Sequence, residues 1–144
     1  MPPLNDHIIR AARPEDADAV LDLAKRFATS FTIAEQSFRV NFAQLLSNAS
    51  ACILVAERQG VVVGYVLGFE HLTFFANGRI AWVEEIMVRQ GQRRSGVGRL
   101  LMQGFEAWAK SRDAKLIALA TRRAASFYTA LGYEDSATYF RKVL

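Results

Sequence analysis

Cysteine and histidine are scarce in this chain, and each scarcity removes a class of site. The 144 residues include one cysteine and two histidines. Cys52 cannot form a disulfide within the chain, which fits a reducing cytoplasm. His7 and His71 have no third residue beside them at the spacing of metal ligands, so we expect no metal.

Long apolar runs are also missing, although 51% of the residues are hydrophobic. No run approaches the roughly 18 apolar residues of a membrane-spanning helix, so we expect no membrane partner. The first six residues lack the basic and apolar regions of a signal peptide, which again favours the cytoplasm. Repeats, low-complexity tracts and long linkers are absent from the sequence. We therefore expect one domain over residues 1–144.

A strong charge of one sign is missing as well. Lys and Arg number 18 against 14 Asp and Glu, for a formal net charge of +4. This excess suits an anionic ligand and does not require nucleic acid. Basic residues cluster only at 93–99 and at Arg122-Arg123, and no basic stripe carries interleaved aromatics. A nucleic-acid-associated module is therefore a less favoured alternative, and we expect no nucleic acid partner.

What is present is an alternation of strands and helices. Strands are expected over residues 7–12, 51–57, 61–70, 79–88 and 114–120. Helices are expected from Pro14 to about residue 28, over 33–46, from residue 97 onward and over 122–131. Residues 133–144 alternate enough for one or two edge strands, which are candidate dimer edges. Gly64 and Gly68 lie inside a strand and predict a bulge or the close packing of a neighbour.

A basic loop with two glycines, Gln92-Arg93-Arg94-Ser95-Gly96-Val97-Gly98-Arg99, runs directly into the third helix. Ser95 is the expected N-cap. The helix start would expose unpaired N–H groups at the positive end of the helix dipole. Because Gly96 and Gly98 have no side chains, a ligand can approach this backbone closely. The loop therefore predicts a phosphate-binding site, with added positive charge from Arg93, Arg94 and Arg99.

Two common phosphate motifs do not fit this loop. Gly91 and Gly96 have the spacing of a P-loop, but Val97 stands where that motif needs its lysine. Gly96 and Gly98 could begin a dinucleotide-binding fingerprint, but Leu101 occupies the third glycine position. A glycine pair that only shapes a helix end remains a simple alternative.

The strand before the loop, Trp82-Val83-Glu84-Glu85-Ile86-Met87-Val88, carries two adjacent glutamates in an otherwise apolar run. Regular alternation would place Glu84 on one face with Ile86 and Val88, and Glu85 on the opposite face with Met87. At least one carboxylate would then face a buried layer or a cleft. The alternative is that both end near solvent at the end of the strand.

Together with residues 124–133, Ala-Ala-Ser-Phe-Tyr-Thr-Ala-Leu-Gly-Tyr, these segments resemble the GNAT superfamily of N-acetyltransferases. Arg93-x-x-Gly96-x-Gly98 matches the superfamily's pyrophosphate motif. The strand is similar to Ile-Glu-Asp-Leu-x-Val, and residues 124–133 are similar to the signature that ends Phe-Tyr-x-x-x-Gly-Phe/Tyr. The resemblance covers about residues 7–144. Its departures are Thr121 at a common asparagine position, Gln90 at a frequent proline and Arg94 at a frequent glycine.

The resemblance implies an α/β (α+β) fold of GNAT type. The sheet would be mixed and mostly antiparallel, with helices on both faces. Its centre would be a splayed pair of parallel strands, 79–88 and 114–120, that opens a cleft for acetyl-CoA. The implied cofactor-binding residues are Ile86, Met87 and Val88 through the strand backbone, Arg93, Arg94, Ser95, Gly96, Val97, Gly98 and Arg99 in the loop, and Thr121.

The implied chemistry is acetyl transfer from acetyl-CoA to an amine. In the superfamily the tyrosine at Tyr128 protonates the departing thiolate, a task that suits a phenol. The attacking amine must be neutral, so a base or an ordered water removes its proton, and Glu84 is the expected base. A backbone N–H at Met87 or Val88 is the expected donor to the oxyanion.

We therefore expect an acetyl-CoA-dependent N-acetyltransferase, with a small-molecule or peptide amine as acceptor. Loops at 29–38 and 71–78 are expected to line the acceptor pocket. His71 is a minor candidate for a substrate contact. The main alternative is a sensor on the same fold that binds acyl-CoA without turning it over.

Overall fold

Five strands form one sheet in the computed structural model, which describes residues 6–28, 31–93 and 95–144. The strands are β1 (His7–Ala11), β2 (Ala51–Arg58), β3 (Val61–Thr73), β4 (Gly78–Val88) and β5 (Ile117–Leu119). The helices are α1 (Ala17–Phe27), α2 (Glu35–Leu46), α3 (Val97–Ser111) and α4 (Ala125–Ala130), with 3-10 turns at η2 (Pro14–Asp16) and η3 (Gln90–Gln92).

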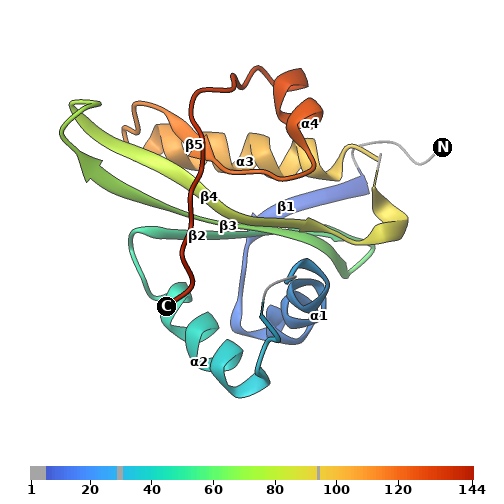
Figure 1. The fold of residues 1–144 in the computed structure, drawn as a ribbon. Coiled ribbons are helices and arrows are strands. Elements are labelled where there is room, and N and C mark those ends of the chain that lie inside the picture. The colour runs from blue at the N-terminus through green and yellow to red at the C-terminus, as the bar shows by residue number, and fades with distance from the viewer. Residues whose placement is uncertain (1–5, 29–30, 94) are drawn as a thin grey trace.

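The sheet order is β1-β2-β3-β4-β5, with antiparallel pairing between successive strands up to β4 and a parallel β4–β5 pair. Helices α1 and α2 cover one face, while α3 and α4 lie on the other (Figure 1). A sheet covered on both faces buries both sides of its inner strands, which explains the nearly continuous apolar run of β2. The predicted mixed sheet with helices on both faces is confirmed.

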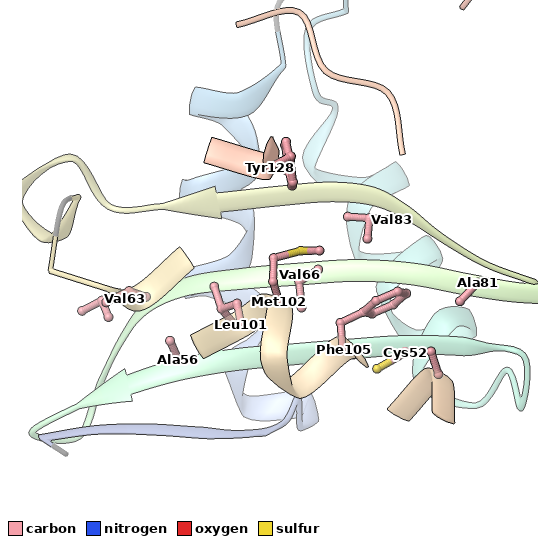
Figure 2. Close-up of a cluster of buried hydrophobic side chains, with 12 residues drawn as sticks. Cys52, Ala56, Val63, Val66, Ala81, Val83, Leu101, Met102, Phe105 and Tyr128 are labelled. Carbon is pink, nitrogen blue, oxygen red and sulfur yellow. The ribbon is translucent and has the colours of Figure 1, made fainter. Parts of the chain in front are cut away.

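The core between the sheet and α3 positions the start of that helix. Leu101, Met102 and Phe105 are each at most 1% exposed and lie over strands β2, β3 and β4 (Figure 2). Gly68 lies directly under the Phe105 ring, since a Cβ there would come 2.2 Å from Phe105 Cε1. Gly64 is similarly close to α3, with Leu101 Cδ1 3.2 Å from an added Cβ. The predicted close packing at both glycines is confirmed.

The parallel pairing of β4 with β5 is short, and β4 continues beyond it without β5. Only Ala81, Trp82 and Val83 pair with β5, through Ile117, Ala118 and Leu119. Strand β4 continues to Val88 and pairs there with β3 alone. The predicted parallel pairing is confirmed, and within the described residues the pair stands at the end of the sheet order.

The C-terminal segment departs from the prediction. Residues 133–144 form no strand, and most of their side chains are exposed. The segment runs extended from α4 toward the α2 end of the molecule (Figure 1). The strands proposed as candidate dimer edges are therefore absent here, because alternation alone does not supply a hydrogen-bonding partner. Helix α4 is also shorter than the predicted 122–131.

Half of the predicted loop at 71–78 is strand. Strand β3 extends to Thr73 and β4 begins at Gly78, so only a tight turn remains between them. Phe74 and Phe75 lie at this tip and are 102% and 74% exposed. Strand β4 has 11 residues and is about 33 Å long, which separates the tip from the start of α3 by the length of the sheet (Figure 1). This places residues 71–78 far from the start of α3, and the expectation that they line the acceptor pocket, with His71 as a minor contact, stays a prediction.

The first helix opens through an ion cluster. Residues 14–16 form a 3-10 turn before α1, and Asp16 at its end is 6% exposed. Arg10 Nη1 and Nη2 donate to the two Asp16 oxygens at 2.8 and 2.9 Å, and Arg10 Nε donates to Glu57 at 2.8 Å. The hydrogen bonds from Arg10 lower the pKa of Asp16. Asp16 thus joins the helix start to strands β1 and β2.

Candidate active site

Helix α3 begins at a glycine. Gly96 is its N-cap with φ +87°, a left-handed conformation that glycine adopts without steric cost. Ser95, the predicted N-cap, instead donates its hydroxyl to the carbonyl of Gln92. Since no side chain caps the helix, the N–H groups of its first turn remain open to an anion.

The predicted loop residues take different positions around this helix start. Arg93 is exposed, and its Nε donates to the Val88 carbonyl at 3.3 Å, which ties the loop to the end of β4. Arg99 is exposed on the first turn of the helix. Val97 is 1% exposed, so its side chain belongs to the core and only its backbone is available to a ligand. Arg94 lies outside the described residues.

Gly98 joins the helix start to α4. A Cβ at Gly98 would lie 3.2 Å from Phe127 Cζ, so the absence of a side chain lets the two helices approach. Phe127 precedes Tyr128, and their rings meet edge to face with centroids 5.0 Å apart. Sequence reasoning identified this glycine but missed its contact with Phe127, which brings Tyr128 close to the loop.

Tyr128 is 8% exposed and lies beside β4, in the same apolar cluster as Val83 (Figure 2). Its hydroxyl makes no hydrogen bond with any described residue. Burial raises the pKa of Tyr128, so the phenol remains a proton donor at neutral pH. The ring of Tyr133 also packs edge to face against the Tyr128 ring, with centroids 5.9 Å apart. The Tyr128 ring is therefore held by two aromatic neighbours, Phe127 and Tyr133.

Beyond Val83, one edge of β4 is open. Ile86, Met87 and Val88 pair with β3 on one side and have no partner strand on the side of β5. Backbone groups that point away from β3 along this stretch are available to a ligand, as at any exposed strand edge. The open edge ends where η3 leads into the uncapped start of α3.

The alternation assumed for β4 is confirmed from Glu85 to Val88, with Met87 on the α1–α2 side and Ile86 and Val88 on the α3 side, but it fails at Glu84. The register with β3 shifts between Leu67 and Gly68: Glu85 pairs with Leu67 and Val83 pairs with Gly68, which leaves Glu84 as an extra, bulged residue. Val83 and Ile86 consequently pack in the same cluster under α3. Glu84 therefore cannot be assigned to the face of Ile86 and Val88 by counting.

The bulge gives the two glutamates different surroundings. Glu85 accepts a hydrogen bond from the hydroxyl of Tyr65 at 2.7 Å, and Tyr65 is 2% exposed on the α1–α2 side of the sheet. Glu84 is exposed and has no hydrogen bond or ion pair with the described residues. Sequence reasoning missed Tyr65, although the glycines in β3 already signalled a bulge.

Thr121 is exposed before α4, and its hydroxyl oxygen accepts a hydrogen bond from the Ala124 N–H at 3.0 Å. Cys52 is buried, and burial raises the pKa of its thiol to about 12. Within the described ranges, no three His, Cys, Asp or Glu side chains come together as a metal site. No helix in those ranges is long and apolar enough to cross a membrane.

Comparison with known proteins agrees with this arrangement. Residues 17–133 match the family described as the Acetyltransferase (GNAT) family. An uncharacterized N-acetyltransferase of Bacillus subtilis, YhfO, is 27% identical over 133 residues, covering 88% of this chain and 89% of the relative. The aminoalkylphosphonate N-acetyltransferase of Salmonella typhimurium is 31% identical over 141 residues, covering 94% and 90%.

Among solved structures, an aminoglycoside N-acetyltransferase in complex with CoA superposes with a TM-score of 0.82 at 17% identity, over 94% of each chain. This likeness shows the fold, and the family match together with the two curated relatives defines the class as N-acetyltransferases. The chain belongs to the GNAT family.

Proposed function

We propose that this protein transfers an acetyl group from acetyl-CoA to a primary amine of a small molecule or peptide by direct attack. The observation that carries the proposal is the convergence of three features at one end of the sheet. These are the open edge of β4 at 86–88, the uncapped start of α3 and the buried phenol of Tyr128.

The site fits the coenzyme in charge and shape. The left-handed glycine and the side-chain-free Gly98 leave the first N–H groups of α3 accessible to the pyrophosphate, and Arg93 and Arg99 add positive charge nearby. The open backbone of Ile86, Met87 and Val88 suits the amide-rich pantetheine arm, as in strand addition. Thr121 is the weakest contact of the set, because its hydroxyl oxygen already accepts the Ala124 N–H.

The reaction needs a proton acceptor, an oxyanion donor and a proton donor. Of the two expected donors, Met87 and Val88, we propose the Val88 N–H for the oxygen of the tetrahedral intermediate. The Arg89 N–H bonds to β3 through Val63, and alternation turns the Met87 N–H the same way, which leaves that of Val88 on the open edge. Tyr128 protonates the departing thiolate: burial keeps its phenol protonated, and its hydroxyl is not engaged by any described residue.

Glu84 remains the proposed base. The argument now rests on the surroundings of its carboxylate and no longer on the alternation of residues along β4. Its carboxylate is solvent-accessible and unpartnered, so it is free to hold the water that takes the proton of the amine. Glu85 is a poorer candidate because it already accepts the hydroxyl of Tyr65.

The relatives suggest where to look for the acceptor. The Salmonella relative is named for an aminoalkylphosphonate and a structural neighbour for an aminoglycoside, both of which are small amines. Purified protein should be supplied with acetyl-CoA and a panel of such amines, polyamines and short peptides, and the release of free CoA thiol followed. Turnover with an amine, and none with the corresponding alcohol, would support the proposal.

Two other results have defined meanings. Tight acetyl-CoA binding without turnover over a broad amine panel would favour the acyl-CoA-binding sensor. Failure to bind acetyl-CoA at all would contradict both functions.

A further inference from the structure

A second basic pocket lies beside the loop, where β2 turns into β3. It has a volume of about 400 Å³ and is lined by Arg58, Gln59, Val61, Val63, Arg89 and Gln92. Gln92 closes it on the side of η3, so the loop segment separates this pocket from the start of α3. None of the roles proposed for acetyl transfer uses its two arginines.

Hydrogen-bond donors exceed acceptors at this pocket. The side-chain oxygen of Gln92 accepts from Arg58 Nη1 at 3.3 Å and lies 3.4 Å from His7 Nε2. Arg58 Nε and His7 Nδ1 are buried without any partner. In the described part of the chain these are the only two such side-chain atoms, and both belong to residues that contact Gln92. Buried polar atoms are nearly always satisfied, and Arg58 Nε can only donate, so its lack of a partner points to a missing acceptor beside Arg58.

The pocket is also positively charged without compensation. Arg58 and Arg89 form no ion pair with any described residue, whereas Arg10, Arg39, Arg79 and Arg112 all do. No acidic residue lines the pocket. Guanidinium groups are well suited to binding phosphate oxygens, and two of them line this one pocket.

The fold holds these groups in place. His7 pairs with Arg58 across β1 and β2, and the register shift after Ala56 leaves Val63 as an extra residue in β3. The Val63 carbonyl accepts the Arg89 N–H at 2.7 Å, which fixes the end of β4 at the pocket wall. A bulge that re-aims a strand in this way often borders a binding site.

We propose that this pocket binds a phosphate group through Arg58 and Arg89, at a position distinct from the start of α3. The phosphate can be free in solution or can belong to the coenzyme itself, whose ribose carries a phosphate monoester. Either source supplies acceptor oxygens to Arg58 and Arg89, the two arginines that line the pocket.

The test is calorimetric titration with inorganic phosphate at constant ionic strength. The protein is titrated alone, saturated with CoA and saturated with dephospho-CoA. If inorganic phosphate binds saturably to the CoA-loaded protein, the pocket is still empty in that complex and free phosphate is its ligand. If inorganic phosphate binds to the dephospho-CoA complex but not to the CoA complex, the ribose phosphate of the coenzyme occupies the pocket.

Arg58→Gln and Arg89→Gln should each weaken the assigned phosphate interaction at least tenfold. Lys25→Gln, which removes an exposed cation on α1 at the opposite face of the sheet, is the matched control and should bind like wild type. Arg89 is only half-buried, so its variant tests the proposal even if Arg58→Gln does not fold. No saturable phosphate binding in any arm, or binding that both arginine variants retain in full, would overturn the proposal. The arm without coenzyme remains informative if acetyl-CoA does not bind, so this test is separate from that of the proposed function.

Discussion

Replacing Tyr128 with phenylalanine separates catalysis from packing more cleanly than any other change in the site. The hydroxyl has no hydrogen bond with a described residue, and the ring contacts with Phe127 and Tyr133 do not need it. The free energy of unfolding should therefore change by about 1 kcal/mol or less. Loss of a general acid typically lowers the rate by about 10²–10⁴-fold. This corresponds to about 3–5 kcal/mol in the activation barrier.

The assay is steady-state turnover with the best amine, together with calorimetric melting. Tyr128→Phe should lower kcat while keeping the KM for acetyl-CoA and the melting temperature. Tyr133→Phe is the matched control, because the Tyr133 hydroxyl donates to Glu106 at 2.8 Å. This control should lose some stability but keep its rate. A Tyr128→Phe enzyme with full kcat would refute the assignment and leave water as the proton donor.

Three further changes test other parts of the account. In pH profiles of kcat/KM, Glu84→Gln should lose the acidic limb and Glu85→Gln should keep it; the reverse result would make Glu85 the base. Gly68→Ala should destabilise the protein by about 1–3 kcal/mol or more in chemical denaturation, because the added Cβ would lie 2.2 Å from the Phe105 ring; an unchanged midpoint would mean that the sheet relaxes there. Asp16 has a lowered pKa in the folded state, so its stabilising effect is present at neutral pH and is lost as the pH falls through that pKa. Wild type should therefore lose more unfolding free energy than Asp16→Asn between pH 5 and about pH 2, and parallel curves would contradict this.

The features that depend on local chemistry were predictable from the sequence. Gly96 and Gly98 indicated a helix start that a ligand can approach, and the apolar periodicity after them predicted α3. Ser95 is not the N-cap because Gly96 takes that position in a left-handed conformation, and the Ser95 hydroxyl donates to the carbonyl of Gln92. Competition between local hydrogen bonds of similar strength is not visible in the order of residues.

The features that depend on contacts distant in sequence were not predictable. Counting along β4 could not assign Glu84 to a face, because the register with β3 shifts opposite Gly68, where the Phe105 ring of α3 packs closely on the sheet. The glycine was recognised as a signal for a bulge, yet the effect falls on the neighbouring strand. The pocket at Arg58 and Arg89 is likewise formed by residues more than thirty positions apart, which share no motif.

Calorimetric titration with acetyl-CoA tests the central claim most directly. We predict saturable binding of one acetyl-CoA per chain by wild type, and none by Gly96→Asp, which places bulk and negative charge at the start of α3. Circular dichroism shows whether the variant remains folded, because the left-handed φ of +87° at Gly96 is unfavourable for aspartate. Gly132→Asp is a matched control, since Gly132 also has a positive φ, of +95°, but lies after α4, away from the start of α3. It should bind like wild type. Absence of binding to wild type at millimolar acetyl-CoA, or full affinity in folded Gly96→Asp, would contradict the account.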